Sequence, residues 1–314
     1  MDKPILTIGI PTYNRPNQIQ RTVRILLPQL TDETLLVVYD NCSSVPVYSL
    51  FTEEEKKHFI IKLNKTNIGG DANIVGVLYN CDTKWCWTLG DDDMLRDDAV
   101  ETVLAHIKKY PDFSFFKFNS PYSQETQGFM DVARLCKLVN IYSVYSQLLF
   151  MSTSIYNMEK MYDYLFYYYR YISTMNGQNV FLLKYLEAND DAVCLFTETP
   201  LVEIRHSDEI PRWSYEDQIV ACPLFFHAFK EKRKQLNGSL FVGYTFGLFH
   251  GIFFTNLGLR KVLKLTCFVA RQYGLINTIR YRGGLLAVYI ASRFIPQKLV
   301  KKLKEYRRNK KGVL

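Results

Sequence analysis

The sequence lacks a CxxC pair, a spacing typical of structural zinc sites, although it has seven cysteines in 314 residues. Because their number is odd and their spacing irregular, we interpret them as reduced, mostly buried thiols of a cytosolic protein. A structural zinc site is therefore not expected. The cysteines are Cys42, Cys81, Cys86, Cys136, Cys194, Cys222 and Cys267.

A secretory signal and a long apolar run are also missing. The chain begins with MDKPILTIGIPTYN, which enters a strand-like run directly, without a charged region and a long apolar region before it. The stretch SLFVGYTFGLFHGIFFTNLG is interrupted by His250 and falls short of the roughly 20 residues that a membrane-spanning helix needs. We expect the protein to stay on the side of the membrane on which it is made.

Acidic residues are scarce at the C-terminal end of the chain. Residues 230–314 contain 19 Lys and Arg and only two acidic residues, whereas the other 229 residues contain 20 basic and 29 acidic residues. An acidic body and a basic tail indicate two different partners or surfaces.

Apolar residues alternate with basic ones in RGGLLAVYIASRFIPQKLVKKLKEYRRNKK, near the C-terminus. This pattern predicts an amphipathic segment that binds an anionic membrane surface, with the protein peripheral on the cytoplasmic face. Nucleic-acid binding is less favoured, because the apolar content is high. A solvated basic tail after an ordinary helical core is the simplest alternative.

Strands and helices alternate over the first 120 residues, which predicts an α/β fold with a mainly parallel sheet and helices on both faces. The expected strands are 5–13, 34–40, 58–64, 84–90 and 113–119, and the expected helices are 17–30, 69–81 and 96–112. Residues 121–210 are less regular, with a helix near 179–190, a strand near 192–206 and an aromatic run, Phe166–Tyr169, of core or membrane-facing character. From about residue 211 the pattern is helical and basic.

Polar residues follow four of the expected strands, at Tyr13–Arg15, Asp40–Asn41, Asn67–Gly70 and Asp91–Asp93. In a parallel sheet these ends meet at one edge, where ligands bind. The last group lies in TLGDDDML, directly after an apolar strand. Three neighbouring carboxylates repel one another, and a divalent cation would relieve that repulsion. Capping of the following helix is the alternative, but Asp97 and Asp98 lie closer to its start.

Four pieces, LTIGIPTYNRPNQIQRTVRIL, VVYDNCSS, NKTNIGGDANIV and WCWTLGDDDML, occur in an order and at separations similar to those of family 2 glycosyltransferases. The resemblance covers roughly residues 4–120. It implies a GT-A fold, a nucleotide-diphosphate-sugar donor, Mn²⁺ or Mg²⁺ at a DxD-type motif, and inversion at the anomeric carbon. We expect residues 1–120 to bind the nucleotide sugar, 121–229 to bind the acceptor, and 230–314 to associate with the membrane.

The resemblance also assigns roles to individual residues. Asp40 would accept the imide N–H of a uracil-type base, Asp91 would reach the ribose, and Asp92 and Asp93 would bind the metal, although which two of the three do so stays open. The family pattern is Asp-x-Asp-Asp, and its first position aligns with Gly90 in one alternative. His206 is a further candidate metal or diphosphate contact. The remaining donor contacts are Pro11, Thr12, Tyr13 and Arg15 around the nucleotide and Asn67, Gly69, Gly70 and Asn73 below the ribose and diphosphate.

The general base is the weakest part of the resemblance. The family often has Glu-Asp at the start of a helix in the acceptor half, where this chain has Gln178-Asn179, and neither side chain can act as a base. Asp191 is the candidate base. The competing interpretation is that Asp190 and Asp191 form a solvated turn. Asp131 and Glu198 are further alternatives.

We therefore expect a metal-dependent inverting glycosyltransferase that moves a sugar from a nucleotide-diphosphate donor, with a UDP-sugar favoured, to a saccharide or lipid-linked acceptor in surface polysaccharide biosynthesis. A catalytically impaired membrane-associated protein of the same fold is one alternative. A sugar-phosphate nucleotidyltransferase is less favoured, because the segment PTYNRP after the first strand has no glycine to hold a triphosphate.

Overall fold

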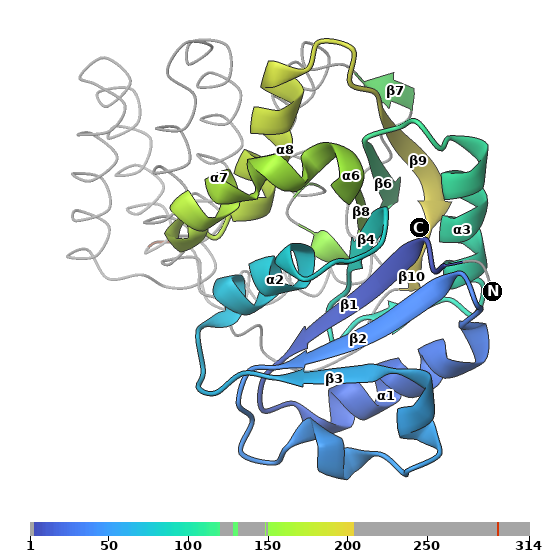
Figure 1. Cartoon of the computed structure of the whole chain (residues 1–314), viewed down its shortest axis with the longest axis vertical. Helices are drawn as coiled ribbons and strands as arrows, with labels where there is room; N and C mark the ends of the chain where they lie inside the picture. Colours follow the sequence, from blue (N-terminus) through green and yellow to red (C-terminus); the bar gives the residue numbers. More distant parts are fainter. Residues whose placement is uncertain (1–2, 120–127, 131–147, 149, 204–293, 295–314) are drawn as a thin grey trace. The chain divides into compact units, whose positions relative to one another are not determined.

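The computed structural model describes residues 3–119, 128–130, 148, 150–203 and 294 (Figure 1). Apart from Phe294, these residues lie in one compact unit, which spans residues 1–138 and 143–208. Several predictions fall outside the described residues: His206, Asp131, the parts 121–127, 131–147, 149 and 204–229 of the acceptor half, and the basic C-terminal segment except Phe294.

An eight-stranded sheet forms the centre of this unit, in the order β3-β2-β1-β4-β8-β6-β9-β7. Neighbours pair in parallel except where β8 or β7 takes part, so the sheet is mainly parallel, as predicted. A second sheet pairs β5 with β10. The strands are β1 Leu6–Thr12, β2 Thr34–Asp40, β3 Ile60–Leu63, β4 Trp85–Thr88, β5 Met94–Leu95, β6 Phe115–Asn119, β7 Gly128–Met130, β8 Ser154–Asn157, β9 Cys194–Pro200 and β10 Val202–Glu203.

Helices cover both faces of the central sheet (Figure 1). The α-helices are α1 Pro16–Leu26, α2 Gly70–Tyr79, α3 Ala99–Lys109, α6 Met158–Met161, α7 Leu165–Arg170 and α8 Gly177–Ala188. The short 3₁₀ turns are η1 Leu27–Gln29, η2 Val47–Leu50, η3 Glu55–His58, η4 Met151–Thr153, η5 Tyr162–Tyr164 and η6 Ile172–Thr174. No helix among the described residues is long and apolar enough to cross a membrane.

β1 shows why both faces are covered, because it is buried on both. Leu6, Ile8 and Ile10 are fully buried and belong to one core with residues of α1 and α3. On the other face, Gly9 lies against α2, so closely that a Cβ at this position would lie 2.1 Å from Cγ1 of Val77. The apolar sequence of β1 therefore reflects a strand between two helical layers.

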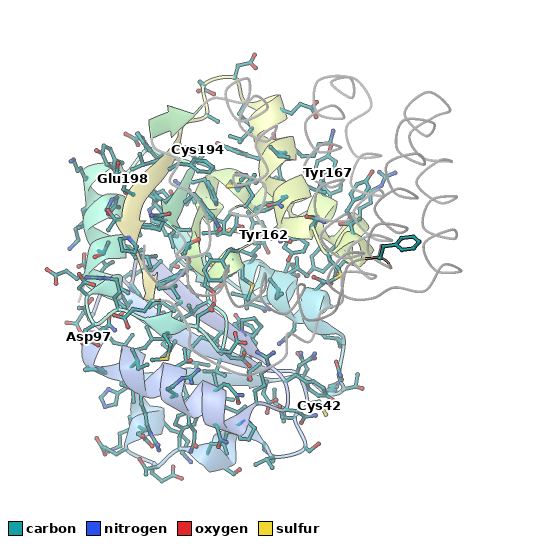
Figure 2. The ribbon with its side chains drawn as sticks, turned by 180° about the vertical axis from the view of Figure 1, so that it is seen from behind. Cys42, Asp97, Tyr162, Tyr167, Cys194 and Glu198 are labelled. Carbon is teal, nitrogen blue, oxygen red and sulfur yellow. The ribbon has the colours of Figure 1, made fainter. Side chains whose placement is uncertain are left out.

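The structure confirms the expected strands and helices of the first 120 residues and adds strands that were not expected, among them β5, β7 and β8. β8 inserts antiparallel between β4 and β6. The aromatic run is divided: Tyr168 is buried, whereas Phe166 and Tyr169 are exposed on α7. Tyr162 and Tyr167, from η5 and α7, are labelled in Figure 2.

Candidate active site

The predicted meeting of strand ends is confirmed for β1, β2 and β4, which are neighbours in the sheet. The backbone N–H of Asn41, just after β2, donates to the Thr12 carbonyl at 3.0 Å, and that of Leu89, just after β4, donates to the Gly9 carbonyl at 3.0 Å. The triplet Asp91–Asp93 follows β4 directly. It therefore lies at the edge of the sheet where parallel strands end.

Asp91 is bound by two side chains from the end of β1. Thr12 Oγ1 donates to Asp91 Oδ2 at 2.7 Å, and Arg15 Nη1 donates to Asp91 Oδ1 at 2.8 Å. The Asp91 side chain is only 7% exposed. Burial raises the pKa of Asp91 above its usual value, although Arg15 and Thr12 act in the opposite direction. Both carboxylate oxygens of Asp91 thus have a protein partner.

Asp92 shares the same guanidinium group, since Arg15 Nη1 also lies 2.7 Å from Asp92 Oδ2. Its side chain is 25% exposed, so it is the more accessible of the two acids that contact Arg15. α1 holds the backbone of this segment as well: Thr22 donates to the Asp91 carbonyl at 2.8 Å and Arg21 to the Asp92 carbonyl at 3.1 Å. A cation from the chain itself therefore offsets part of the charge of the triplet.

Asp93 is held from a distant part of the chain. Ser152, in η4, donates its hydroxyl proton to Asp93 Oδ2 and accepts a hydrogen bond from the Gly90 N–H at 2.8 Å. None of the three acids caps α3, which begins at Ala99 without a side-chain capping bond; Asp98 pairs instead with Arg96 at 2.9 Å. The capping interpretation of the triplet is therefore wrong.

The other strand ends form an asparagine network. Asn41 Nδ2 donates to Asn67 Oδ1 at 2.8 Å, and Asn41 Oδ1 accepts from Asn64 Nδ2 and from the Ile68 N–H, both at 3.0 Å. Asn67 Oδ1 also accepts from the N–H of Gly69, whose φ of +90° favours glycine. The network fixes the loop before α2, so that Gly70 begins the helix with open space beside its Cα.

Three comparisons with known proteins agree with this geometry. Residues 7–154 match the model of glycosyl transferase family 2. These residues therefore form a family 2 glycosyltransferase domain. A protein of Haemophilus influenzae described as an uncharacterized glycosyltransferase is 26% identical over 133 residues, which are 41% of this chain and 44% of that protein. The match thus spans less than half of the relative's length.

Two solved structures of glycosyltransferases have the same fold. TarS of S. aureus, residues 1–349 in complex with UDP-GlcNAc, has a TM-score of 0.61 at 14% identity, over 97% of this chain and 92% of TarS. The mannosyltransferase PcManGT of Pyrobaculum calidifontis, in complex with GDP-Man and Mn²⁺, has a TM-score of 0.50 at 12% identity, over 93% of this chain and 83% of PcManGT. At these identities the likeness establishes the GT-A fold and no more.

The residues predicted to bind the donor lie close together in the glycosyltransferase, but several carry protein contacts. Asp40 is 1% exposed, and its oxygens accept the backbone N–H groups of Ser43 at 2.9 Å and Val47 at 3.0 Å. Asn73 is also buried and donates to the Tyr39 carbonyl at 2.9 Å. Both side chains therefore shape the loops. The contact of Asp40 with a base stays a prediction. Tyr13, at the end of β1, is 36% exposed.

Of the predicted metal ligands, the structure describes Asp92 and Asp93, whereas His206 lies outside the described residues. No group of three His, Cys, Asp or Glu side chains with metal-binding geometry occurs in the described part of the chain. Mg²⁺ and Mn²⁺ need fewer protein ligands, because one or two carboxylates plus substrate phosphates suffice. Two adjacent carboxylates at a strand end, one of them partly exposed, fit a cation of this kind.

The structure does not bring Asp191 to the triplet. Asp191 is exposed in the turn between α8 and β9. β9 runs parallel to β6, and its first residue is Cys194, so Asp191 lies at the amino ends of the parallel strands, opposite to the edge with the triplet. At the start of α8, Asn179 is buried, and its Nδ2 lies 3.4 Å from Asn176 Oδ1. The described residues thus place no carboxylate at the first turn of α8.

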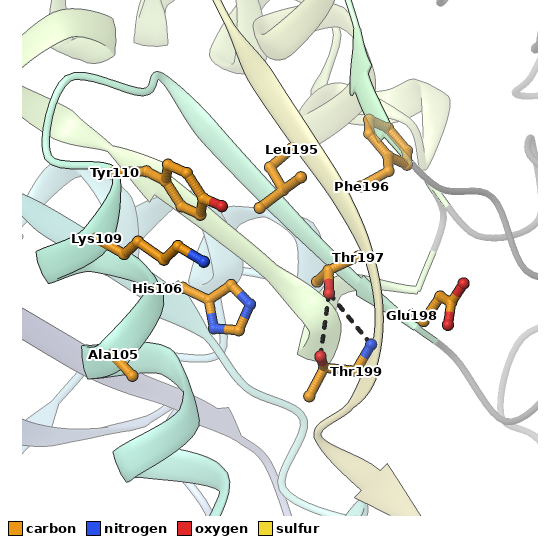
Figure 3. A pocket seen from close by; sticks show the side chains of 9 residues that line it. All are labelled: Ala105, His106, Lys109, Tyr110, Leu195, Phe196, Thr197, Glu198 and Thr199. Carbon is orange, nitrogen blue, oxygen red and sulfur yellow. Dashed lines mark hydrogen bonds between the residues drawn. The ribbon is translucent and has the colours of Figure 1, made fainter.

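A cavity of ≈ 490 Å³ lies elsewhere, between α3 and β9 (Figure 3). His106, Lys109 and Tyr110 from α3 and its end point toward Thr197 and Thr199 of β9. His106 Nδ1 is 2.8 Å from the Thr102 carbonyl of its own helix, so the ring is already oriented within α3. No residue that lines the cavity belongs to the triplet, so the cavity is separate from the candidate site at the strand ends.

Sequence reasoning missed the residues that hold the triplet in place. Ser152, Arg21 and Thr22 contact it from η4 and α1, and Asn64 supports the asparagine network. The sequence offered a signal for Arg21 and Thr22, because their helix directly follows the PTYNRP turn and was therefore expected near the strand ends. Ser152 had none, because its place depends on the unexpected antiparallel strand β8.

Proposed function

We propose that the chain transfers a sugar from a nucleotide-diphosphate donor, with a UDP-sugar favoured, to a saccharide or lipid-linked acceptor in surface polysaccharide biosynthesis. The observation that carries this proposal is the arrangement of Asp91–Asp93 at the strand ends, next to Arg15 and Thr12. Two relatives of this fold were solved with UDP-GlcNAc and with GDP-Man, which supports a nucleotide sugar without deciding the base.

In this proposal the loop before α2 receives the ribose and diphosphate. Gly70 opens α2, and a Cβ added to it would meet nothing within 4 Å beyond its chain neighbours and its own helix, so a ligand can approach the backbone there. The asparagine network keeps the loop in one conformation before the donor binds, which reduces the ordering cost of binding.

Asp92 and Asp93 would hold Mn²⁺ or Mg²⁺, which acts as a Lewis acid and template for the departing diphosphate. Asp91 would have a different role, because its two carboxylate oxygens already accept hydrogen bonds from Thr12 and Arg15. Transfer in a single displacement inverts the anomeric carbon and requires a base for the acceptor hydroxyl. Asn179 and its neighbour Gln178 cannot accept that proton.

The test is a screen of UDP-, GDP- and dTDP-sugars by thermal shift with and without Mn²⁺, followed by measurement of donor hydrolysis. We expect a metal-dependent rise in melting temperature with a UDP-sugar, since a ligand that binds only the folded state stabilises it. Asp92→Ala should lose the metal-dependent part of the rise. Binding without turnover would favour the catalytically impaired alternative, and neither binding nor turnover with any donor would contradict the proposal.

We further propose that residues 230–314 attach the enzyme to an anionic membrane surface on the cytoplasmic face. The support is the sequence: 19 Lys and Arg against two acidic residues, interleaved with apolar side chains near the C-terminus. A peripheral position would bring the enzyme to a lipid-linked acceptor.

A further inference from the structure

Ser152 reaches the triplet from η4, a part of the chain far from both the β4–β5 connection and the end of β1. Its hydroxyl makes two contacts at once: it donates to Asp93 Oδ2 and accepts from the Gly90 N–H at 2.8 Å. Ser152 is 1% exposed, so water does not compete for these contacts. One hydroxyl therefore connects the first and the last residue of the Gly90–Asp93 turn.

The position of Ser152 is itself fixed from two sides. Its carbonyl accepts a hydrogen bond from Trp87 Nε1 of β4 at 2.8 Å. Lys117 of β6, which is 1% exposed, donates to the Phe150 carbonyl before η4 and to Ser154 Oγ after it, the latter at 2.8 Å. The buried lysine thus holds the two ends of the turn that carries Ser152.

The topology explains why η4 reaches the triplet. β8 runs antiparallel beside β4, with Ile155 opposite Trp87, so the residues before β8 meet the residues after β4. In a purely parallel sheet this place would belong to the end of another strand. The inserted strand β8 therefore delivers Ser152 to the site.

The Asp93 carboxylate and the Ser152 hydroxyl also fill the space beside Gly90. A Cβ at position 90 would lie 2.7 Å from Asp93 Oδ2 and 3.1 Å from Ser152 Oγ. The Asp93 carboxylate and the Ser152 hydroxyl thus occupy the volume that an Asp at the first position of the family pattern would need. A side chain at position 90 would therefore have to displace the Asp93 carboxylate.

We propose that Ser152 is a positioning residue for the metal site, whose hydroxyl fixes the Asp93 carboxylate in the conformation that binds the cation. The inference rests on the proposed metal-dependent function. The proposal gives the three acids of the triplet different roles. Asp91 binds Thr12 and Arg15. The metal is bound by Asp93, which Ser152 fixes, and by Asp92, which is more exposed than Asp91. Groups that orient metal ligands typically change metal affinity by about 10- to 100-fold when they are removed.

The experiment measures Mn²⁺ affinity of the full-length protein by electron paramagnetic resonance, with Mn²⁺ alone and with Mn²⁺ and UDP. Ser152→Ala removes the hydroxyl and should weaken Mn²⁺ binding by about tenfold or more. The matched control is Thr153→Val, because Thr153 is equally buried in η4 and donates to the Phe150 carbonyl at 3.2 Å, away from the triplet. This control should stay within about twofold of the wild type.

Gly90→Ala tests the same contact without removing the Ser152 hydroxyl, since the new methyl group would lie 2.7 Å from Asp93 Oδ2 and push the carboxylate away. It should also weaken Mn²⁺ binding, whereas Gly76→Ala, on α2 with open space around it, should not. Melting curves without metal show whether each variant is folded. If Ser152→Ala does not fold, the Mn²⁺ affinity of Gly90→Ala tests the positioning role instead.

The outcomes separate the inference from the function on which it rests. A folded Ser152→Ala protein with wild-type Mn²⁺ affinity, or an equal loss in Thr153→Val, overturns the positioning role while the metal site stands. A double variant, Ser152→Ala with Asp93→Asn, should bind Mn²⁺ no more weakly than Asp93→Asn alone. The reason is that Ser152 acts only through the Asp93 carboxylate, so the two effects do not add. A wild-type protein that binds no Mn²⁺ in either condition overturns the metal-dependent function and the positioning role together.

Discussion

Arg15 places one guanidinium nitrogen within 2.8 Å of Asp91 and 2.7 Å of Asp92. Two adjacent carboxylates at a buried strand end repel each other, and a single shared cation reduces that repulsion. The guanidinium is planar and stays charged, so it suits this position better than a lysine would. Part of the charge of the triplet is therefore balanced by the chain itself.

We expect Arg15→Gln to lower the free energy of unfolding by about 1.5 to 3 kcal/mol, the usual range for hydrogen bonds to charged groups. The reason is that Asp91, which is largely buried, keeps its charge but loses the donor. Urea denaturation measures the change. The control is Arg24→Gln, whose pair with Glu55 lies on the surface, where water screens it, so this change should affect stability much less. Equal stability of Arg15→Gln and the wild type would show that the carboxylates need no internal cation.

At the scale of the element, β1 and α2 form the support below the site. Gly9 is the point of closest approach, because Val77 occupies the space of a side chain there. β1 ends at Thr12 and continues to Arg15, while α2 begins at Gly70, so the packing of these two elements sets the distance between the triplet and the loop predicted to bind diphosphate.

Gly9→Ala should therefore destabilise the protein by about 1 to 3 kcal/mol, the usual cost of an overpacked core. Gly9→Ala with Val77→Ala should recover part of the loss, because the smaller side chain makes room for the new methyl group. Equilibrium unfolding of both variants and of Val77→Ala alone completes the cycle. If the double variant were as unstable as the sum of the single ones, the contact between Gly9 and Val77 would not be the cause.

The elements that sequence could predict are those with a strong local pattern. β1, β2, β4 and β6 are apolar runs buried on both faces, bounded by polar turns, and each was expected. β8 was not, because its sequence SIYN is short and mixes polar with apolar residues, so that it forms neither an apolar run nor a clear alternation. The triplet could be located from its strand end. Its partner Ser152 could not, since that contact exists only once β8 lies beside β4.

At the scale of the whole molecule, the charge is divided along the chain. The described unit belongs to the acidic part, whereas residues 230–314 carry 19 basic and two acidic residues. An acidic catalytic domain is repelled by anionic lipid, so attachment in our proposal depends on the basic segment. The enzyme would then meet a lipid-linked acceptor without burying its nucleotide site in the membrane.

Deletion of residues 285–314 should release the protein from vesicles that contain anionic lipid, as measured by co-sedimentation. Binding of the full-length protein should weaken as NaCl rises from 50 to 500 mM, because exposed charges are screened over about 10 Å at 0.1 M salt and over less at higher salt. Vesicles of neutral lipid are the control and should bind weakly. Mn²⁺-dependent binding of UDP should survive the deletion, since every predicted donor and metal residue precedes position 207. Unchanged sedimentation of the shortened protein would place the membrane contact elsewhere in the chain, and loss of UDP binding would show that the C-terminal segment also supports the active site.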